Sequence, residues 1–270
     1  MKRLRVTEIV VASMLIGSLA ACGGTKSPHA AVGAASTKPT ISTTSTGAVT
    51  DAARATLAAN AQVKMTIAMK DPSEGEIPPI AVTGSYDMAK DAGKLDVAIG
   101  PQTMSEIFTK DTLYAKSAVI KGVPADKWLA VNRSGLKSHY LLRTPGNDPA
   151  AFVSQIADLT EVQSLGSDPI GQETMKRYRG KFATDTLTRY LAPDKVADTT
   201  TLINVANPIF ADIWVDSSGR IVRIVVSYTA DTLTSNTELD LTYSANEPSP
   251  AIPNAADILT GTLSGGALVG

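Results

Sequence analysis

The stretch PIFADIWVDSSGRIVRIVVSYTA, residues 208–230, contains two runs rich in Ile and Val on either side of the turn sequence DSSG. Two such runs around a short turn that contains glycine predict a β-hairpin. This hairpin is the strongest strand signal in the chain. We therefore expect the folded part of the protein to be built on an antiparallel sheet.

Other segments repeat the pattern on both sides of the hairpin. Residues 62–70, 80–87 and 94–100 alternate apolar and polar side chains and are joined by short polar turns, which predicts a meander. A second hairpin is expected over residues 105–118, and further strands over residues 127–133, 173–184 and 237–245. The sum is a sheet of about nine to eleven strands, a size at which sheets curl.

Three segments carry helical rather than strand periodicity. A helix over residues 50–60 is expected to start at Thr50, and one over residues 149–160 has Asp148 as its cap and Pro149 at its first position. A third is expected over residues 185–192. The fold class is therefore α+β, with the helices available to cover one apolar face of a large antiparallel sheet.

The N-terminus reads as an export signal. Three basic residues precede a thirteen-residue apolar stretch that ends at Ala21, too short for a transmembrane helix, which needs roughly 20 apolar residues. The sequence Leu19-Ala20-Ala21-Cys22 then resembles the lipobox of bacterial lipoproteins. We expect residues 1–21 to be a signal peptide, and the single cysteine, Cys22, to carry the lipid.

Residues 22–47 consist mostly of Ser, Thr, Ala, Gly and Pro, a composition that buries too little surface to fold. As a flexible tether they would reach roughly 25–30 Å. The expected organisation is a signal peptide, a lipidated tether and one domain over residues 48–270. The expected location is the outer face of the cell membrane, lipid-anchored and extracytoplasmic.

Charge and composition argue against several classes of protein. The net charge of the chain is −1, and removal of residues 1–21 makes it −3, so we expect no nucleic-acid partner, which would call for a basic patch. The two histidines, His29 and His139, stand alone, and G-x-S-x-G is absent. Ser134 and Lys137 fit S-x-x-K, but the accompanying S-D-N and K-T-G motifs are missing. We expect no enzyme activity, no metal and no cofactor.

One set of residues suggests a family. Trp214-Val215-Asp216 precedes the SSG turn, and Tyr178 and Gly180 occupy family positions in the strand before it, with Arg177 in place of the usual His. Over residues 48–260 the chain resembles the actinobacterial lipoproteins of the LppX/LprG type, relatives by fold of the lipoprotein carrier LolA. The resemblance implies a half-barrel with helices across its concave face and an apolar cavity that takes up lipid acyl chains.

The expected cavity residues come from the alternation of the strands and the spacing of the second helix. They are Val63, Met65, Ile67, Val82, Leu95, Val97, Phe152, Ile156 and Leu159. With only 5% aromatic residues, the core is left to aliphatic side chains and methionines, which adapt to variable apolar shapes.

The predicted function is binding of lipid acyl chains, as a carrier or transfer protein held to the membrane through Cys22. The alternative is a surface interaction module without lipid cargo, partnering a membrane transporter, a sensor or a cell-wall enzyme. An unrecognised hydrolase is the third reading, and it would require a polar cleft with convergent ionisable groups.

Overall fold

The computed structural model describes residues 43–71, 75–76, 78–206, 208–243 and 250–261. The chain divides into two units, residues 1–38 and 39–270, and every described residue belongs to the second. The expected signal peptide, Cys22 and most of the expected tether lie outside the described residues.

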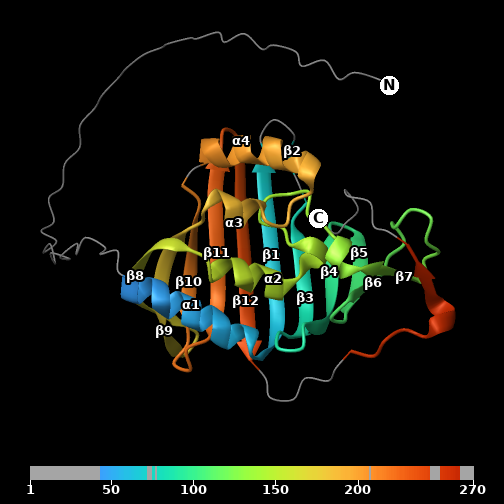
Figure 1. The fold of residues 1–270 in the computed structure, drawn as a ribbon, viewed down its shortest axis with the longest axis horizontal. Helices are drawn as coiled ribbons and strands as arrows, with labels where there is room; N and C mark the ends of the chain where they lie inside the picture. The colour runs from blue at the N-terminus through green and yellow to red at the C-terminus, as the bar shows by residue number, and fades with distance from the viewer. Residues whose placement is uncertain (1–42, 72–74, 77, 207, 244–249, 262–270) are drawn as a thin grey trace, which may run out of the picture. The chain divides into compact units, whose positions relative to one another are not determined.

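The described part is dominated by one 13-stranded sheet (Figure 1), with the strand order β13-β7-β6-β5-β4-β3-β1-β12-β11-β10-β9-β8 and β2 paired with β1. Apart from β13, which runs parallel to β7, neighbouring strands are antiparallel. The strands are β1 (Asn60–Asp71), β2 (Gly75–Glu76), β3 (Ile80–Asp87), β4 (Ala92–Ile99), β5 (Gln102–Phe108), β6 (Thr112–Lys116), β7 (Trp128–Asn132), β8 (Thr160–Ile170), β9 (Glu173–Lys181), β10 (Phe210–Val215), β11 (Ile221–Ala230), β12 (Leu233–Tyr243) and β13 (Ile258–Thr260). The sheet is curved and open, because its edge strands β8 and β13 do not pair with each other.

Four α-helices accompany the sheet: α1 (Thr43–Leu57), α2 (Pro149–Ile156), α3 (Thr184–Thr188) and α4 (Val196–Ala206). In Figure 1, α1, α2 and α3 cross the same face of the sheet, and α4 lies at one end of the central strands, where it contacts β11. Short 3-10 turns lie at residues 133–135, 145–147, 193–195 and 255–257. The expected fold class, a large curved antiparallel sheet with helices across its concave face, is confirmed.

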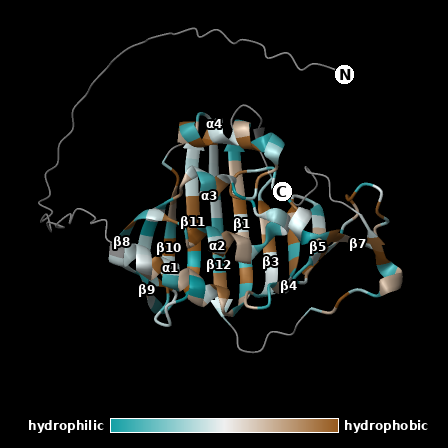
Figure 2. Cartoon of the chain, viewed as in Figure 1, coloured by the Kyte–Doolittle hydropathy of each residue, from teal (hydrophilic) through white to brown (hydrophobic). Residues whose placement is uncertain are grey.

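Alternation along the strands decides which face is buried. Figure 2 shows apolar residues recurring along the central strands. Strand pairing joins them into a row across the sheet, whose members are Tyr178, Ile213, Ile224, Leu239, Met65, Val82, Val97 and Met104, all buried. The neighbouring residues on each strand point to the other face, which is polar. The apolar face is the one the helices cover.

Hydrogen bonds fasten α1 to the sheet at the central strands. Thr56 is fully buried, and its hydroxyl donates to the Ala52 carbonyl (2.8 Å) and accepts from the backbone N–H of Ile221 in β11 (2.9 Å). The Tyr243 hydroxyl of β12 lies 3.2 Å from the same oxygen. One threonine therefore links the first helix to two strands more than 160 residues away in the chain.

Several expected boundaries were wrong. The first helix begins at Thr43 instead of Thr50, so it includes the last five residues of the expected tether. Strand β8 and helix α4 were not expected, and α3 is shorter than the helix expected over residues 185–192. In β8 only Val162 is buried, and the strand contains Gly166 and Pro169, so it lacks the alternation on which strand prediction depends.

Candidate ligand-binding site

The nine residues expected to contact a ligand are brought together by the fold. Six lie on β1, β3 and β4, two on α2, and Leu159 just before β8. All nine belong to one core cluster between the sheet and the helices, which we call the apolar layer. The strand pairs Met65–Val82 and Val82–Val97 place three of them side by side.

The apolar layer is closed in this structure. The exposed fractions of the nine side chains lie between 0% and 4%, so they pack closely against their neighbours. Val63 also contributes to the lining of an open pocket of about 680 Å³ that includes Leu241 and Tyr243. Whether they contact a ligand stays a prediction. A ligand that enters the layer has to separate the helices from the sheet.

Other layer residues were missed by the choice made from the sequence. Ile213, Ile224, Val226 and Leu239 lie on the same buried face, in β10–β12, and are fully buried. The sequence does contain a signal for these residues. The first three belong to the hairpin of residues 208–230, and Leu239 belongs to the strand that follows it. The face of that hairpin could be assigned only once its pairing with β12, which in turn pairs with β1, was known.

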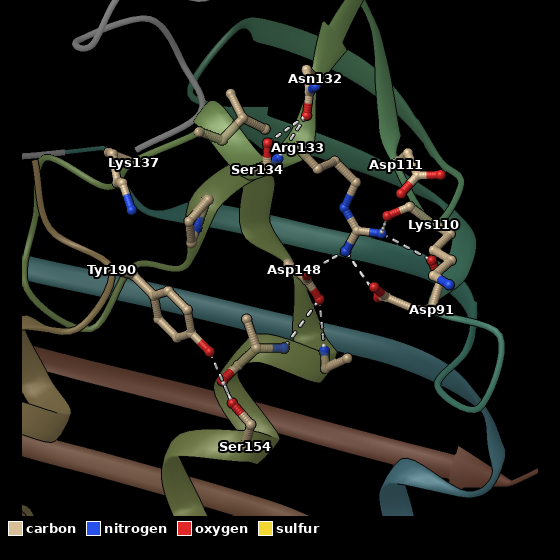
Figure 3. Close-up of a pocket in the computed structure, with 14 residues that line it drawn as sticks. Asp91, Lys110, Asp111, Asn132, Arg133, Ser134, Lys137, Asp148, Ser154 and Tyr190 are labelled. Carbon is tan, nitrogen blue, oxygen red and sulfur yellow. Dashed lines mark hydrogen bonds and ion pairs between the residues drawn. The ribbon is translucent and has the colours of Figure 1, made fainter.

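A polar pocket of about 640 Å³ opens to solvent beside α2 (Figure 3). It was not expected from the sequence. Its lining comes from five separate parts of the chain: Asp91; Lys110 and Asp111; five residues between Asn132 and Lys137; five residues between Pro145 and Ser154; and Tyr190. Because these segments are distant in sequence and individually unremarkable, no local pattern indicated them.

Arg133 forms the boundary between the polar pocket and the apolar layer. Its guanidinium donates to Asp148 Oδ2 (2.5 Å), Asp91 Oδ1 (2.8 Å) and the Tyr86 hydroxyl (3.2 Å). It also lies over the ring of Phe108, 5.3 Å from its centroid. Tyr86 and Phe108 are fully buried and pack edge to face. The arginine therefore covers the aromatic end of the core and faces the pocket (Figure 3).

Asp148 has two roles in the same place. Its Oδ1 accepts from the backbone N–H groups of Ala150 and Ala151 (2.9 and 3.1 Å), which caps α2 as the sequence predicted. Its Oδ2 holds Arg133. Burial raises the pKa of Asp148, against the lowering effect of the Arg133 charge. One carboxylate thus ties the start of α2 to the wall of the pocket.

A second polar cluster is buried next to the layer. Glu106 of β5 is fully buried, and both its carboxylate oxygens accept from Asn147 Nδ2 (3.1 Å each). Asn147 Oδ1 in turn accepts from the guanidinium of Arg143, which is also buried. Burial raises the pKa of Glu106 to about 8, although the Asn147 hydrogen bond and the Arg143 charge act in the opposite direction. Nothing in the sequence distinguished this glutamate from a solvent-exposed one.

Ser134 and Lys137, the S-x-x-K pair, both line the polar pocket and are exposed. The Ser134 hydroxyl donates to Asn132 Oδ1 (2.8 Å), as part of the cap of the turn at residues 133–135. The hydroxyl is therefore engaged in local turn structure. His139 is half-buried in the loop that follows.

Within the described residues, no group of three or more His, Cys, Asp and Glu side chains is placed to hold a metal ion. None of the described helices has both the length and the apolar character needed to cross a bilayer.

Comparison with known proteins gives distant structural similarities. No family model matches the chain, and no curated protein sequence does. LprF from Mycobacterium bovis is similar at 13% identity with a TM-score of 0.47, over 78% of this chain and 97% of that one. The lipoprotein LppX from Mycobacterium tuberculosis follows at 13% identity and a TM-score of 0.45, over 77% and 98%. A LolA superfamily protein from Nitrosomonas europaea has 10% identity and a TM-score of 0.37, over 76% and 94%. The resemblance to LppX and LolA stated from the sequence is thus found again among solved structures, as a distant likeness.

Proposed function

We propose that this protein is an extracytoplasmic lipoprotein, anchored to the outer face of the cell membrane through Cys22, that binds lipid acyl chains between its sheet and its helices. The observation that carries the proposal is the apolar layer. Its residues, drawn from β1, from β3 to β12 and from the four α-helices, form one continuous cluster that is almost entirely aliphatic along the central strands.

The layer is covered by α1 and α4, with 15 and 11 residues, and by two shorter helices. Helix α2 has eight residues and α3 has five, so their part of the cover is slight for a sheet of 13 strands. Each methylene of a bound chain that leaves water contributes about 0.8 kcal/mol. A chain of ordinary length could therefore offset the loss of helix–sheet contacts on opening. Such binding depends on buried area and makes little distinction between chains of similar length.

The anchor and the layer serve the same role in this proposal. A lipid on Cys22 would keep the layer close to the membrane from which acyl chains come, and a tether would leave the domain free to turn. A transporter or sensor in the same membrane could act as donor or acceptor of the lipid.

Two variants of adjacent residues on β3 test the proposal. Val82 faces the apolar layer and is fully buried, whereas Thr83 is exposed on the opposite face. In the full chain, Val82→Phe should fill the layer and abolish the fluorescence increase of a bound polyene fatty acid. Thr83→Phe should bind the probe like the unaltered protein. Circular dichroism would establish that both variants are folded, since overfilling a core costs about 1–3 kcal/mol.

The interaction module is a second candidate, and the closed packing of the layer favours it. If the unaltered protein fails to bind the fatty-acid probe, and native mass spectrometry of protein purified with membrane lipid shows only the mass of the chain, lipid binding is wrong. The exposed polar pocket beside α2 would then be the first surface to test for a protein partner.

A further inference from the structure

Among the described residues, the buried side-chain polar atoms without a hydrogen-bond partner include two on uncharged side chains, one on α2 and one on β12. They are Oε1 of Gln155 and Oγ1 of Thr237. The two residues are 2% and 1% exposed. Buried polar groups are nearly always hydrogen-bonded, because an unmatched one loses its bonds to water without replacement. Each of these atoms therefore calls for an explanation.

Gln155 lies on the buried side of α2. Its Nε2 donates to the backbone carbonyl of Thr186 in α3 (2.9 Å), which links the two short helices that cover the sheet. The same bond fixes the direction of the amide, since only the nitrogen can donate to a carbonyl. The Oε1 atom is left buried with its acceptor capacity unused, between α2 and its neighbours.

Thr237 lies on β12 and faces the apolar layer. Strand pairing places it in a row with Ala211, Val226, Ile67, Ile80 and Ile99, all apolar, and the row ends at Gly180 on one side and at the exposed Gln102 on the other. Ile67 is one of the residues expected to contact an acyl chain. Valine has nearly the same shape as threonine, so packing alone does not require a hydroxyl at this position.

The chemistry of the two atoms restricts which groups could form a hydrogen bond with them. An amide oxygen only accepts hydrogen bonds, so the partner of Gln155 has to bring an O–H or N–H group. A hydroxyl such as that of Thr237 can donate or accept. A hydrocarbon chain offers neither, and an ester offers only acceptors.

We propose that the apolar layer binds an acyl ligand that carries a hydroxyl or amide N–H group within its apolar part, with Gln155 Oε1 accepting from that group and Thr237 Oγ1 as the second hydrogen-bonding group of the layer. This inference rests on the proposed function and makes its ligand class narrower. An ordered water could satisfy the same atoms, and the experiment has to separate the two cases.

The test compares stearic acid with 12-hydroxystearic acid, two ligands of equal chain length, as competitors of the polyene fatty-acid probe on the full chain. The unaltered protein should prefer the hydroxylated acid by about fivefold to tenfold, the ratio expected for one net hydrogen bond. Gln155→Met and Thr237→Val keep the volume of each side chain approximately, and each should reduce this preference towards one. Gln62→Met and Thr242→Val are the controls, because these paired residues of β1 and β12 are exposed on the face of the sheet opposite the layer, and they should leave the preference unchanged.

The outcomes separate this inference from the proposed function. Equal affinity of the unaltered protein for the two acids would overturn the inference, leave lipid binding intact and point to water as the partner. A preference that survives in both Gln155→Met and Thr237→Val would also overturn it. Failure of both acids to compete with a bound probe would contradict the inference, and failure of the probe itself to bind would contradict the proposed function as well. If Gln155→Met does not fold, Thr237→Val decides the outcome alone.

Discussion

Glu106 is the residue whose chemistry departs most from its ordinary behaviour. Burial raises its pKa to about 8, whereas an unfolded chain ionises a glutamate near 4.5. The folded protein therefore holds a proton that the unfolded chain releases between these values. The stability that results is complete at low pH and is lost as the pH rises towards 8.

The variant Glu106→Gln should remove this dependence, because an amide does not titrate and its oxygen still accepts from Asn147. Between pH 5 and pH 8, the free energy of unfolding of the unaltered protein should fall relative to that of the variant by up to about 1.4 kcal/mol per pH unit. Urea unfolding at pH 5, 6.5 and 8 would measure this. If the free energy of unfolding changed with pH in the same way for the unaltered protein and for the variant, the pKa of Glu106 would be the same in the folded and unfolded states, which would contradict the prediction.

Arg133 should be the most costly arginine to remove. Its side chain is 11% exposed and satisfies Asp148, whose side chain is 12% exposed. Arg133→Met leaves a buried carboxylate without its cation, a change that costs about 3–5 kcal/mol. Chemical unfolding would measure the loss.

The rescue variant is Arg133→Met with Asp148→Asn. An asparagine keeps an oxygen that caps α2 but carries no charge, so the double variant should recover part of the lost stability. A double variant as unstable as the sum of the two single changes would contradict the ion-pair account.

At the scale of the elements, Gly84 lies inside β3, where a glycine in a strand often marks a bend or bulge. The structure shows regular pairing at this position, with Val63 on one side and Leu95 on the other. The glycine is needed for a close approach instead. A Cβ atom at residue 84 would lie 2.1 Å from the Lys94 carbonyl oxygen, and the φ angle is +156°.

Gly84→Ala should therefore destabilise the protein by at least about 2–3 kcal/mol, because β3 and β4 would have to separate. Gly47→Ala in α1 is the matched control. No atom lies within 4 Å of the Cβ it would gain, so it should stabilise the protein by about 0.5–1 kcal/mol through helix propensity. Thermal unfolding of both variants would reveal the contrast. Similar melting temperatures would show that β4 adapts to the methyl group.

The layered arrangement explains why the elements differ in their tolerance to change. The central strands are held by pairing on both sides, whereas α2 is held through its cap, through Gln155 and through the Ser154–Tyr190 hydroxyl pair (3.1 Å). An element with few tertiary contacts opens locally, and the free energy of that opening is lower than the free energy of global unfolding. We therefore expect α2 and α3 to separate from the sheet before the strands do.

At the scale of the whole molecule, the anchor is the feature that the proposed function requires. Cys22→Ser in the full chain should move the protein from the membrane fraction to the soluble extracytoplasmic fraction, because the lipid expected at a lipobox is attached through the cysteine thiol, which serine lacks. Immunoblots of the two fractions would measure the shift. Binding of the fatty-acid probe by the released protein should be unchanged, which would separate anchoring from ligand binding.

Local sequence determined the strands that alternate and the cap of α2. Met65, Val82 and Val97 could be placed on one buried face because side chains alternate with a period of two in any strand. Asp148 and Pro149 marked the start of α2 because a capping carboxylate and a following proline act within one turn of a helix. Strand β8 and helix α4 were not predicted, because the apolar residues of these segments follow no clear period.

Contacts between distant segments were decided only by the tertiary structure. Glu106 meets Asn147, and Arg133 meets Asp91, across more than 40 residues of chain. Three features depend on such contacts between distant segments. They are the polar pocket, the raised pKa of Glu106, and the buried atoms of Gln155 and Thr237 that lack a hydrogen-bond partner. The physical reason is that periodicity records which face of an element is buried, whereas burial of a polar group and the identity of its partner depend on what the fold packs against that face.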